Sequence, residues 1–210
     1  YKRQRWYNQF FKRAFDLSVA TVGTIAISPI LLGIAIAIKA SSPGPAFYAH
    51  RRIGKDGIYF NCYKFRSMVV DSDRRLQEYL RANPEAAKEW EETHKLKHDP
   101  RVTKIGAFLR KTSLDELPQL FNVIRGQMSL VGPRPIVDEE VIKYDVFFSD
   151  YTMVRPGMTG LWQTSGRSDT SYSRRVRLDA WYVRNWNIWL DISLLVKTVR
   201  VVLSSHSGAY

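Results

Sequence analysis

Cysteine is the scarcest residue in this sequence. Cys62 is the single cysteine among 210 residues, so an internal disulfide is excluded. A chain without disulfides fits a reducing compartment. Internal repeats and low-complexity tracts are also absent. The fold must therefore come from the pattern of apolar residues rather than from cross-links.

Acidic residues are also few. The chain has 20 Asp and Glu against 32 Lys and Arg, a net charge of +12. Such a chain attracts polyanions, whether nucleic acid, anionic lipid or phosphorylated substrates, and composition does not choose among them. The charged fraction of 25% and mean hydropathy of −0.28 argue against a polytopic membrane protein. Because the sequence starts at Tyr1 rather than Met, we expect it to be the C-terminal part of a longer chain.

Long apolar runs are limited to one, the 22 uncharged residues from Leu17 to Ile38. A straight helix of that length spans about 33 Å, just enough to cross a hydrocarbon core. However, Pro29 must kink or break it, and basic residues flank both of its ends. Positive flanks favour the cytoplasmic side. These features alone support a re-entrant hairpin and a spanning helix equally. The preceding stretch, Tyr1 to Arg13, mixes basic and aromatic residues, as suits a lipid headgroup region or an ordinary surface helix.

The rest of the chain contains short segments whose patterns predict strands or helices. Residues 46–70 predict strands around a turn framed by Gly54 and Gly57, and residues 71–99 predict a charged helical excursion interrupted by Pro84. A helix is expected to start near Ser113 or Asp115 and to stop at Gly126. Residues 173–203 predict one or two amphipathic helices.

Two short motifs suggest chemistry. In the first, Ser113 to Gln119 (SLDELPQ), the adjacent carboxylates of Asp115 and Glu116 could divide their roles, one attacking phosphorus while the other holds a metal. The alternative is structural, because Ser113-x-x-Glu116 is a capping-box pattern. In the second, prolines flank Arg134 and stiffen the backbone around a side chain suited to phosphate. Its alternative is an exposed turn.

With these motifs the chain resembles the bacterial sugar transferase family, the monotopic phosphoglycosyl transferases. The resemblance runs from about Phe11 to Leu203. The matching pieces are Ser28-Pro29, Lys64 to Met68 (KFRSM), Asp99 to Thr103 (DPRVT), Leu109 to Gln119 (LRKTSLDELPQ), Met128 to Pro135 (MSLVGPRP), Arg155 to Gly160 (RPGMTG) and Asp191.

The resemblance implies roles for individual residues. Asp115 corresponds to the nucleophile, Glu116 to its partner and a magnesium ligand, and Asp191 to a second metal ligand, with a charge at the N-terminus of a final helix as its alternative role. Ser28-Pro29 corresponds to a membrane break, which favours re-entry. The predicted substrate-binding residues, each otherwise an ordinary surface charge, are Lys64, Arg66, Arg110, Arg134, Arg155 and Arg167.

The implied fold is α/β and irregular. It has a re-entrant membrane helix-break-helix at residues 17–38, amphipathic surface helices and a small sheet carrying the active site, all in one catalytic domain, residues 1–210. One departure is His50, where many relatives have Gln. The long charged stretch after residue 71 resembles the branch that transfers galactose phosphate to undecaprenyl phosphate.

The implied reaction moves hexose-1-phosphate, galactose first and glucose as the alternative, from a UDP-sugar to undecaprenyl phosphate. It releases UMP through an aspartyl-phosphosugar intermediate with Mg²⁺. The expected setting is the cytoplasmic face of the bacterial inner membrane, at the first membrane step of polysaccharide or O-antigen synthesis. We expect no nucleic-acid partner and leave a homodimer open. The rival interpretations are direct single-step transfer and a non-enzymatic basic protein that binds membranes or nucleic acid.

Overall fold

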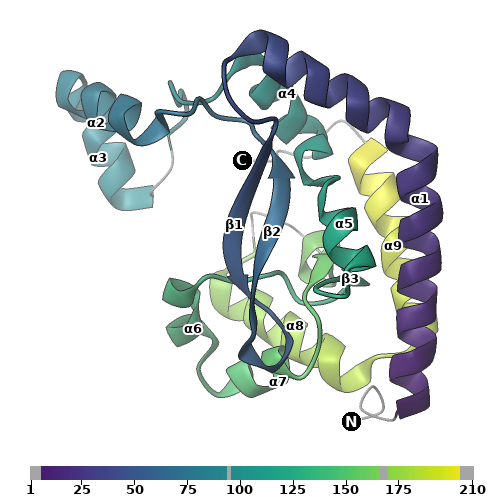
Figure 1. The fold of residues 1–210 in the computed structure, drawn as a ribbon. Helices are drawn as coiled ribbons and strands as arrows, with labels where there is room; N and C mark the ends of the chain where they lie inside the picture. The colour runs from purple at the N-terminus through teal and green to yellow at the C-terminus, as the bar shows by residue number, and fades with distance from the viewer. Residues whose placement is uncertain (1–5, 94–95, 166–169, 204–210) are drawn as a thin grey trace.

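The computed structural model describes residues 6–93, 96–165 and 170–203, and within these residues it is mostly helical with two small two-stranded sheets. One long N-terminal helix, α1 (Trp6–Ser41), runs along one side of the molecule (Figure 1). It is the one helix in the described part that is long and apolar enough to cross a membrane, by length and composition. Only 11% of its most apolar window is buried. The long apolar helix predicted from the sequence is therefore present and largely uncovered by protein.

Pro29 lies inside α1 without ending it. Proline cannot donate a hydrogen bond to the carbonyl four residues earlier, which belongs to Ile25. The Ser28 hydroxyl donates to that carbonyl instead, at 2.8 Å. The ribbon bends partway along α1 (Figure 1), and we assign the bend to Pro29 because sharp kinks arise mostly at proline. The sequence predicted two helices separated by a break, whereas the helix is continuous and bent because Ser28 replaces the missing donor.

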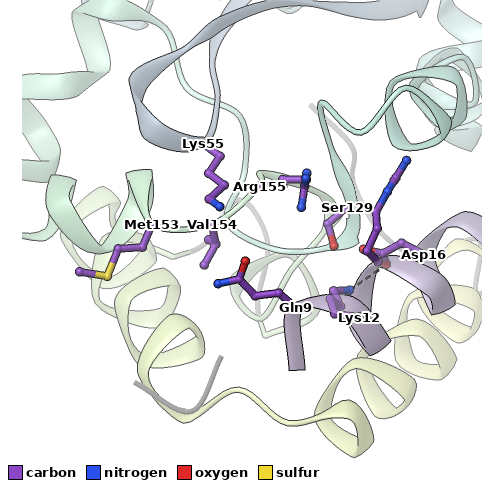
Figure 2. A pocket seen from close by; sticks show the side chains of 9 residues that line it. Gln9, Lys12, Asp16, Lys55, Ser129, Met153, Val154 and Arg155 are labelled. Carbon is purple, nitrogen blue, oxygen red and sulfur yellow. Dashed lines mark hydrogen bonds and ion pairs between the residues drawn. The ribbon is translucent and has the colours of Figure 1, made fainter. Parts of the chain in front are cut away.

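The first turns of α1 are anchored to the rest of the molecule by a buried ion-pair network. Lys12 Nζ lies 2.8 Å from Asp16 Oδ1, a contact drawn in Figure 2, and 2.8 Å from Asp191 Oδ2. Asp191 belongs to α9 (Ile188–Leu203). All three side chains are almost fully buried. The network therefore joins the two ends of the chain.

The hairpin predicted in residues 46–70 is confirmed. Strands β1 (Phe47–Ile53) and β2 (Tyr59–Phe65) pair antiparallel around the short helix η2 (Lys55–Gly57). In β2, Phe60 and Cys62 are buried whereas Tyr59 and Asn61 are exposed, so the two faces differ as the alternation predicted; at the end of the strand Phe65, on the face of Tyr59, is buried as well. Lys64 lies two residues after Cys62 on the same face of β2, and it is partly exposed where Cys62 is buried.

The charged excursion forms two helices, and Pro84 begins the second, as proline's tolerance in a first helical turn allows. The C-terminal stretch forms two helices, which confirms the prediction. The other elements, in chain order, are α2 (Ser72–Ala82), α3 (Pro84–Thr93), α4 (Lys104–Thr112), η3 (Leu114–Glu116), α5 (Gln119–Ile124), β3 (Ser129–Val131), α6 (Asp138–Tyr144), η4 (Asp145–Phe147), α7 (Phe148–Thr152), β4 (Gly157–Thr159), η5 (Trp162–Thr164) and α8 (Tyr172–Asn185).

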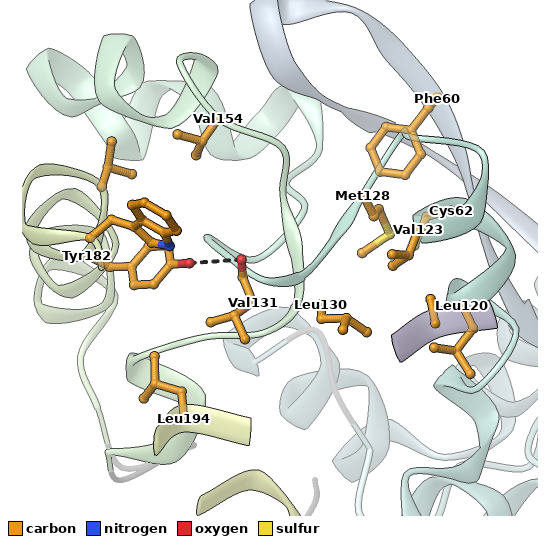
Figure 3. Packing of buried hydrophobic residues seen from close by; sticks show 13 residues of the cluster. Phe60, Cys62, Leu120, Val123, Met128, Leu130, Val131, Val154, Tyr182 and Leu194 are labelled. Atoms are coloured by element: carbon orange, nitrogen blue, oxygen red, sulfur yellow. Dashed lines mark hydrogen bonds between the residues drawn. The ribbon is translucent and has the colours of Figure 1, made fainter. Parts of the chain in front are cut away.

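The main hydrophobic core lies between α1, β2, α5, β3, α8 and α9 (Figure 3). Its members include Ala20, Cys62, Val123, Val131 and Leu194, each at most 1% exposed. A second cluster packs the C-terminal part of α1 against the end of β2 and α4. Both parts of the bent helix are thus attached to the domain, although most of its apolar surface stays exposed.

Candidate active site

The carboxylate pair sits on a turn between two helices rather than inside one. Ser113 ends α4 in the left-handed conformation, with φ 57°, and its amide donates to Arg110 O at 3.2 Å. Asp115 and Glu116 follow in the single 3₁₀ turn η3, which leads through Pro118 into α5. The Ser113 side chain makes no capping bond to this turn. The capping-box alternative is therefore wrong, because Ser113 serves as the C-terminal cap of the preceding helix.

Asp115 is buried, with 9% of its surface exposed. Burial raises the pKa of its carboxyl to about 6, with a further increase from neighbouring Glu116, while Lys64 and Arg110 lower it. A carboxylate with that pKa is mostly ionised at neutral pH but is less well solvated than a surface aspartate. A poorly solvated carboxylate among cations is a suitable nucleophile.

Glu116 faces the hairpin across a short ion pair. Lys64 Nζ donates to Glu116 Oε1 at 2.6 Å, and the side chains are 31% and 40% exposed. A pair this exposed contributes little to stability. Its significance is positional, because it brings a lysine of β2 next to the carboxylate pair of η3.

A pocket opens beside this ion pair and gathers three cations. Arg52 of β1, Lys64 of β2 and Arg134 line it together with Glu116; we call it the cationic pocket. Three cations thus face one carboxylate in its lining, and Arg52 and Lys64 also add to the effect of burial in lowering the pKa of the nearby His50. Arginine and lysine side chains converging on one cavity are suited to a diphosphate.

The pocket includes a residue that the sequence did not single out. Arg52 counted only as a basic flank of the apolar segment, yet its guanidinium donates to Pro135 O at 3.3 Å and contacts His50 Nδ1 at 2.9 Å. The pairing of β1 with β2, which sets Arg52 opposite Phe60, carries it to the pocket. The available signal was the basic pair Arg51-Arg52, which directly follows His50, the position where this sequence departs from many relatives.

The Pro-Arg-Pro loop is fixed by close backbone contacts. Gly157 N donates to Pro133 O at 2.7 Å, and a Cβ added at Gly157 would lie 2.1 Å from Gly132 N. Glycine at position 157 thus allows the RPG and GPRP segments to touch at the parallel pair β3–β4. The Arg134 side chain is itself held, with NH1 3.1 Å from Glu140 Oε1. The backbone contacts of the loop and the ion pair with Glu140 thus position Arg134 beside the cationic pocket.

Two carboxylates, those of Glu140 and Asp179, contact the Pro-Arg-Pro loop. The second carboxylate oxygen of Glu140 accepts from Val137 N at 3.1 Å and lies 3.7 Å from Arg52 NH1. Asp179 of α8 is 2% exposed, and burial raises its pKa to about 8, opposed by hydrogen bonds from Tyr144 and from the Arg134 backbone. Glu140 thus lies between the guanidinium groups of Arg52 and Arg134 and reduces the repulsion between them.

The other predicted cations are spread more widely. Arg110 lies near the carboxylate pair, lowering the Asp115 pKa, and its Nε donates to Ser67 Oγ at 3.1 Å. Arg66 is buried and donates to Ser42 O and Pro43 O, so it fixes the segment after α1 instead of lining the cationic pocket. Arg155 donates to Gly126 O at 2.6 Å in a different pocket (Figure 2). Arg167 lies outside the described residues.

Asp191 is not brought to Glu116. Asp191 is 0% exposed. Its carboxylate pairs with Lys12 and accepts hydrogen bonds from Tyr182 OH at 2.6 Å and from Trp186 Nε1 at 3.0 Å. Beside Lys12, Arg13 caps the C-terminal carbonyls of α5, whereas Glu116 precedes its N-terminus. In the structure Asp191 thus belongs to the buried network around Lys12, and its assignment as a metal ligand stays a prediction.

A magnesium ion fits the remaining residues in one way. In the described part of the chain, no three Asp, Glu, His or Cys side chains gather to form an all-protein metal site. Mg²⁺ is commonly held by one or two carboxylates together with substrate phosphates. Glu116 offers one accessible carboxylate beside the cationic pocket, with Asp115 adjacent. These residues fit a magnesium ion that is shared with a bound diphosphate.

Comparison with known proteins assigns the family. The family model described as bacterial sugar transferase matches residues 7–205. The chain is 52% identical to the undecaprenyl-phosphate galactose phosphotransferase of Salmonella typhimurium, aligning 97% of this chain with 42% of that protein. It is 51% identical to the exopolysaccharide production protein ExoY of Rhizobium meliloti, with 95% and 88% covered. It is 41% identical to the UDP-glucose:undecaprenyl-phosphate glucose-1-phosphate transferase of Escherichia coli, with 91% and 40% covered.

The chain thus spans less than half the length of some curated relatives and most of the length of others. The match includes the hairpin, the carboxylate turn and the Pro-Arg-Pro loop that together form the cationic pocket. This chain belongs to the bacterial sugar transferase family.

Proposed function

We propose that this chain transfers hexose-1-phosphate from a UDP-sugar to undecaprenyl phosphate, with release of UMP. The observation that carries the proposal is Asp115, a buried carboxylate whose pKa is raised to about 6, next to a pocket lined by Arg52, Lys64 and Arg134. A nucleophile beside clustered cations suits attack on a diphosphate. The related proteins named as lipid-carrier phosphotransferases act on this class of substrate.

The reaction proceeds in two displacements. Arg52, Lys64 and Arg134 bind the donor diphosphate and offset the charge that develops on it. An Asp115 carboxylate oxygen forms a bond to the sugar-linked phosphorus, and the bond from that phosphorus to the UMP oxygen breaks. Magnesium, when bound, supplies charge stabilisation on the diphosphate. An oxygen of undecaprenyl phosphate then attacks the same phosphorus, and Asp115 leaves as a carboxylate.

The two-step route suits the burial of Asp115. The first step releases a soluble nucleotide before the lipid reacts, so the pocket need not hold both substrates together. Direct single-step transfer is the rival route, and it would give the buried carboxylate no covalent role. Isotope exchange between UMP and UDP-sugar without lipid acceptor is expected only for the two-step route.

The sugar is assigned from relatives. We propose galactose, because the galactose phosphotransferase is 52% identical to this chain and the glucose-1-phosphate transferase 41%. A UMP-release screen across UDP-sugars, with undecaprenyl phosphate as acceptor, tests both the function and the sugar. UDP-galactose is expected to give the highest kcat/KM. Release of UMP from no UDP-sugar, despite a folded chain, would contradict the proposed function, and preference for UDP-glucose would overturn only the sugar.

Glu116 is the proposed magnesium ligand. Glu116→Gln keeps the shape of the side chain and removes its charge, so turnover is expected to fall about 10²-fold or more. The matched control is Glu139→Gln, an exposed acid at the start of α6 that does not line the pocket, and its activity should be near that of the wild type. Full wild-type activity in EDTA would rule out the metal role.

The bent helix α1 is proposed to enter and leave the membrane on the cytoplasmic face. Its bend at Pro29 and the cations near both ends support re-entry. Single cysteines at Tyr7 and Lys39, in a Cys62→Ala background, should both label from the cytoplasmic side. Pro29→Ala restores the missing amide donor and should shift the helix towards spanning. If the cysteines at positions 7 and 39 label from opposite sides of the membrane while Pro29 is present, re-entry is disproved.

A further inference from the structure

A second basic pocket lies away from the carboxylate pair. It is bounded by the first turns of α1, by η2 and by the segment that carries Arg155, and we call it the α1 pocket. Figure 2 shows Lys55, Arg155 and Gln9 extending towards the same space, with Lys12 paired to Asp16 at its edge. The proposed transfer reaction uses none of these side chains.

The lining of the α1 pocket has an excess of positive charge. Four cations line it, namely Lys12, Arg13, Lys55 and Arg155, against one carboxylate, Asp16. Asp16 and the adjoining Asp191 both pair with Lys12, so they offset at most two of the four charges. Lys55 Nζ also lies 3.9 Å from the carboxylate of Asp56, but that side chain is 66% exposed, and such a pair is weak.

The two arginines are held rigidly at the end of α5. Arg13 donates to Val123 O at 2.6 Å and to Ile124 O at 2.8 Å, while Arg155 donates to Gly126 O at 2.6 Å. Each of these three bonds goes to a neutral carbonyl oxygen, so the bonds orient the guanidinium groups. A rigid pair of guanidinium groups next to a lysine is suited to a phosphate group.

The surroundings of the α1 pocket indicate where such a phosphate comes from. Gln9, Lys12 and Arg13 alternate along α1 with Trp6, Phe10 and Phe11, which are 79%, 64% and 65% exposed. Trp189, at the start of the adjoining α9, is 75% exposed. Exposed aromatic rings interleaved with cations are typical of the level of lipid headgroups. A soluble phosphate ligand would give these rings no reason to be exposed.

We propose that the α1 pocket binds the phosphate of an anionic phospholipid headgroup and so fixes the depth of α1 at the membrane surface. This inference rests on the membrane location proposed above and not on the identity of the reaction. Lys55 is the informative residue, because it is the lining cation that belongs to neither the buried Lys12 network nor the end of α5.

The test counts lipid molecules retained by the detergent-solubilised chain, using native mass spectrometry with phosphatidylglycerol or phosphatidylcholine added. The wild type should retain one phosphatidylglycerol per chain in preference to phosphatidylcholine. Lys55→Ala should lose about fivefold or more in this affinity, since a lysine near an anionic lipid is worth about 1 kcal/mol. Lys88→Ala, an exposed lysine of α3 with the same charge change, should retain the lipid like the wild type.

Three outcomes would overturn the proposal. Lys55→Ala could retain phosphatidylglycerol as the wild type does, or phosphatidylcholine could bind as tightly. Inorganic phosphate could displace the lipid at equal concentration, which would assign the pocket to a free anion. Transfer activity of Lys55→Ala towards a detergent-solubilised acceptor should stay at the wild-type level. If Lys55→Ala lost transfer activity but retained the lipid, the lipid-binding role of the α1 pocket would be disproved, while the proposed transfer reaction would stand.

Discussion

Asp115→Asn is expected to abolish turnover while leaving the fold intact. The amide has nearly the size of the carboxylate but no nucleophilic oxygen anion, so both net transfer and UMP exchange should disappear. Donor binding should largely survive, because Arg52, Lys64 and Arg134 line the pocket independently of Asp115. Binding of UDP-galactose by calorimetry separates loss of chemistry from loss of the pocket. Asp73→Asn, an exposed aspartate of α2, is the matched control.

The raised pKa of Asp115 adds two consequences. Below a pKa of about 6 the nucleophile is protonated, so wild-type kcat/KM should fall about tenfold for each pH unit below that value. Because the folded-state pKa lies above the unfolded value, the folded chain binds more protons between about pH 4 and 6. Protonation of Asp115 therefore stabilises the fold as pH falls through this window. Removing the charge by Asp115→Asn should raise thermal stability at neutral pH, and lower stability together with lost donor binding would indicate misfolding instead.

Lys12→Met is expected to destabilise the fold more than any other substitution considered. Methionine keeps the length of the apolar stem but leaves Asp16 and Asp191 buried without their shared cation. Breaking a buried ion pair by removing one partner costs about 3–5 kcal/mol. For a chain of this size that corresponds to a fall in Tm of roughly 10 °C. The measurement is thermal unfolding in detergent.

Two variants make that result specific. Lys39→Met changes an exposed lysine of the same helix and should leave Tm near the wild-type value. Asp191→Asn leaves Lys12 paired with Asp16 and should cost less than Lys12→Met. It should also leave the magnesium dependence of the folded enzyme unchanged. A Tm of Lys12→Met equal to that of Lys39→Met would mean that the network does not hold α1 in place.

The sequence predicted the features that are determined by residues close together in the chain. Alternation over seven residues identified β2 and the face of Lys64, and Pro84 marked the division between two helices. The carboxylate pair and Arg134 were recognised because each sits within a short motif. The strand and helix predictions are confirmed because their physical cause, strand pleating or proline geometry, acts within a few residues, whereas the roles of the carboxylate pair and of Arg134 stay predictions.

The features that the sequence did not predict depend on contacts between distant segments. Ser113 matched a capping box, but the turn after α4 places it in the left-handed region, where it closes the preceding helix instead. Arg52 reaches the cationic pocket only because β1 pairs with β2, and Asp191 meets Lys12 across 179 positions of sequence. Contacts between distant segments are set by packing, and no local pattern records them.

The most direct measurement of the central claim is the intact mass of the chain after incubation with UDP-galactose and magnesium, without lipid acceptor. The wild-type chain is expected to gain the mass of one hexose phosphate, mapped by peptide digestion to Asp115 and lost when undecaprenyl phosphate is added. The same treatment of Asp115→Asn should give no adduct. An adduct that persists in Asp115→Asn, or a wild-type enzyme that turns over without UMP exchange and without an adduct, would contradict it.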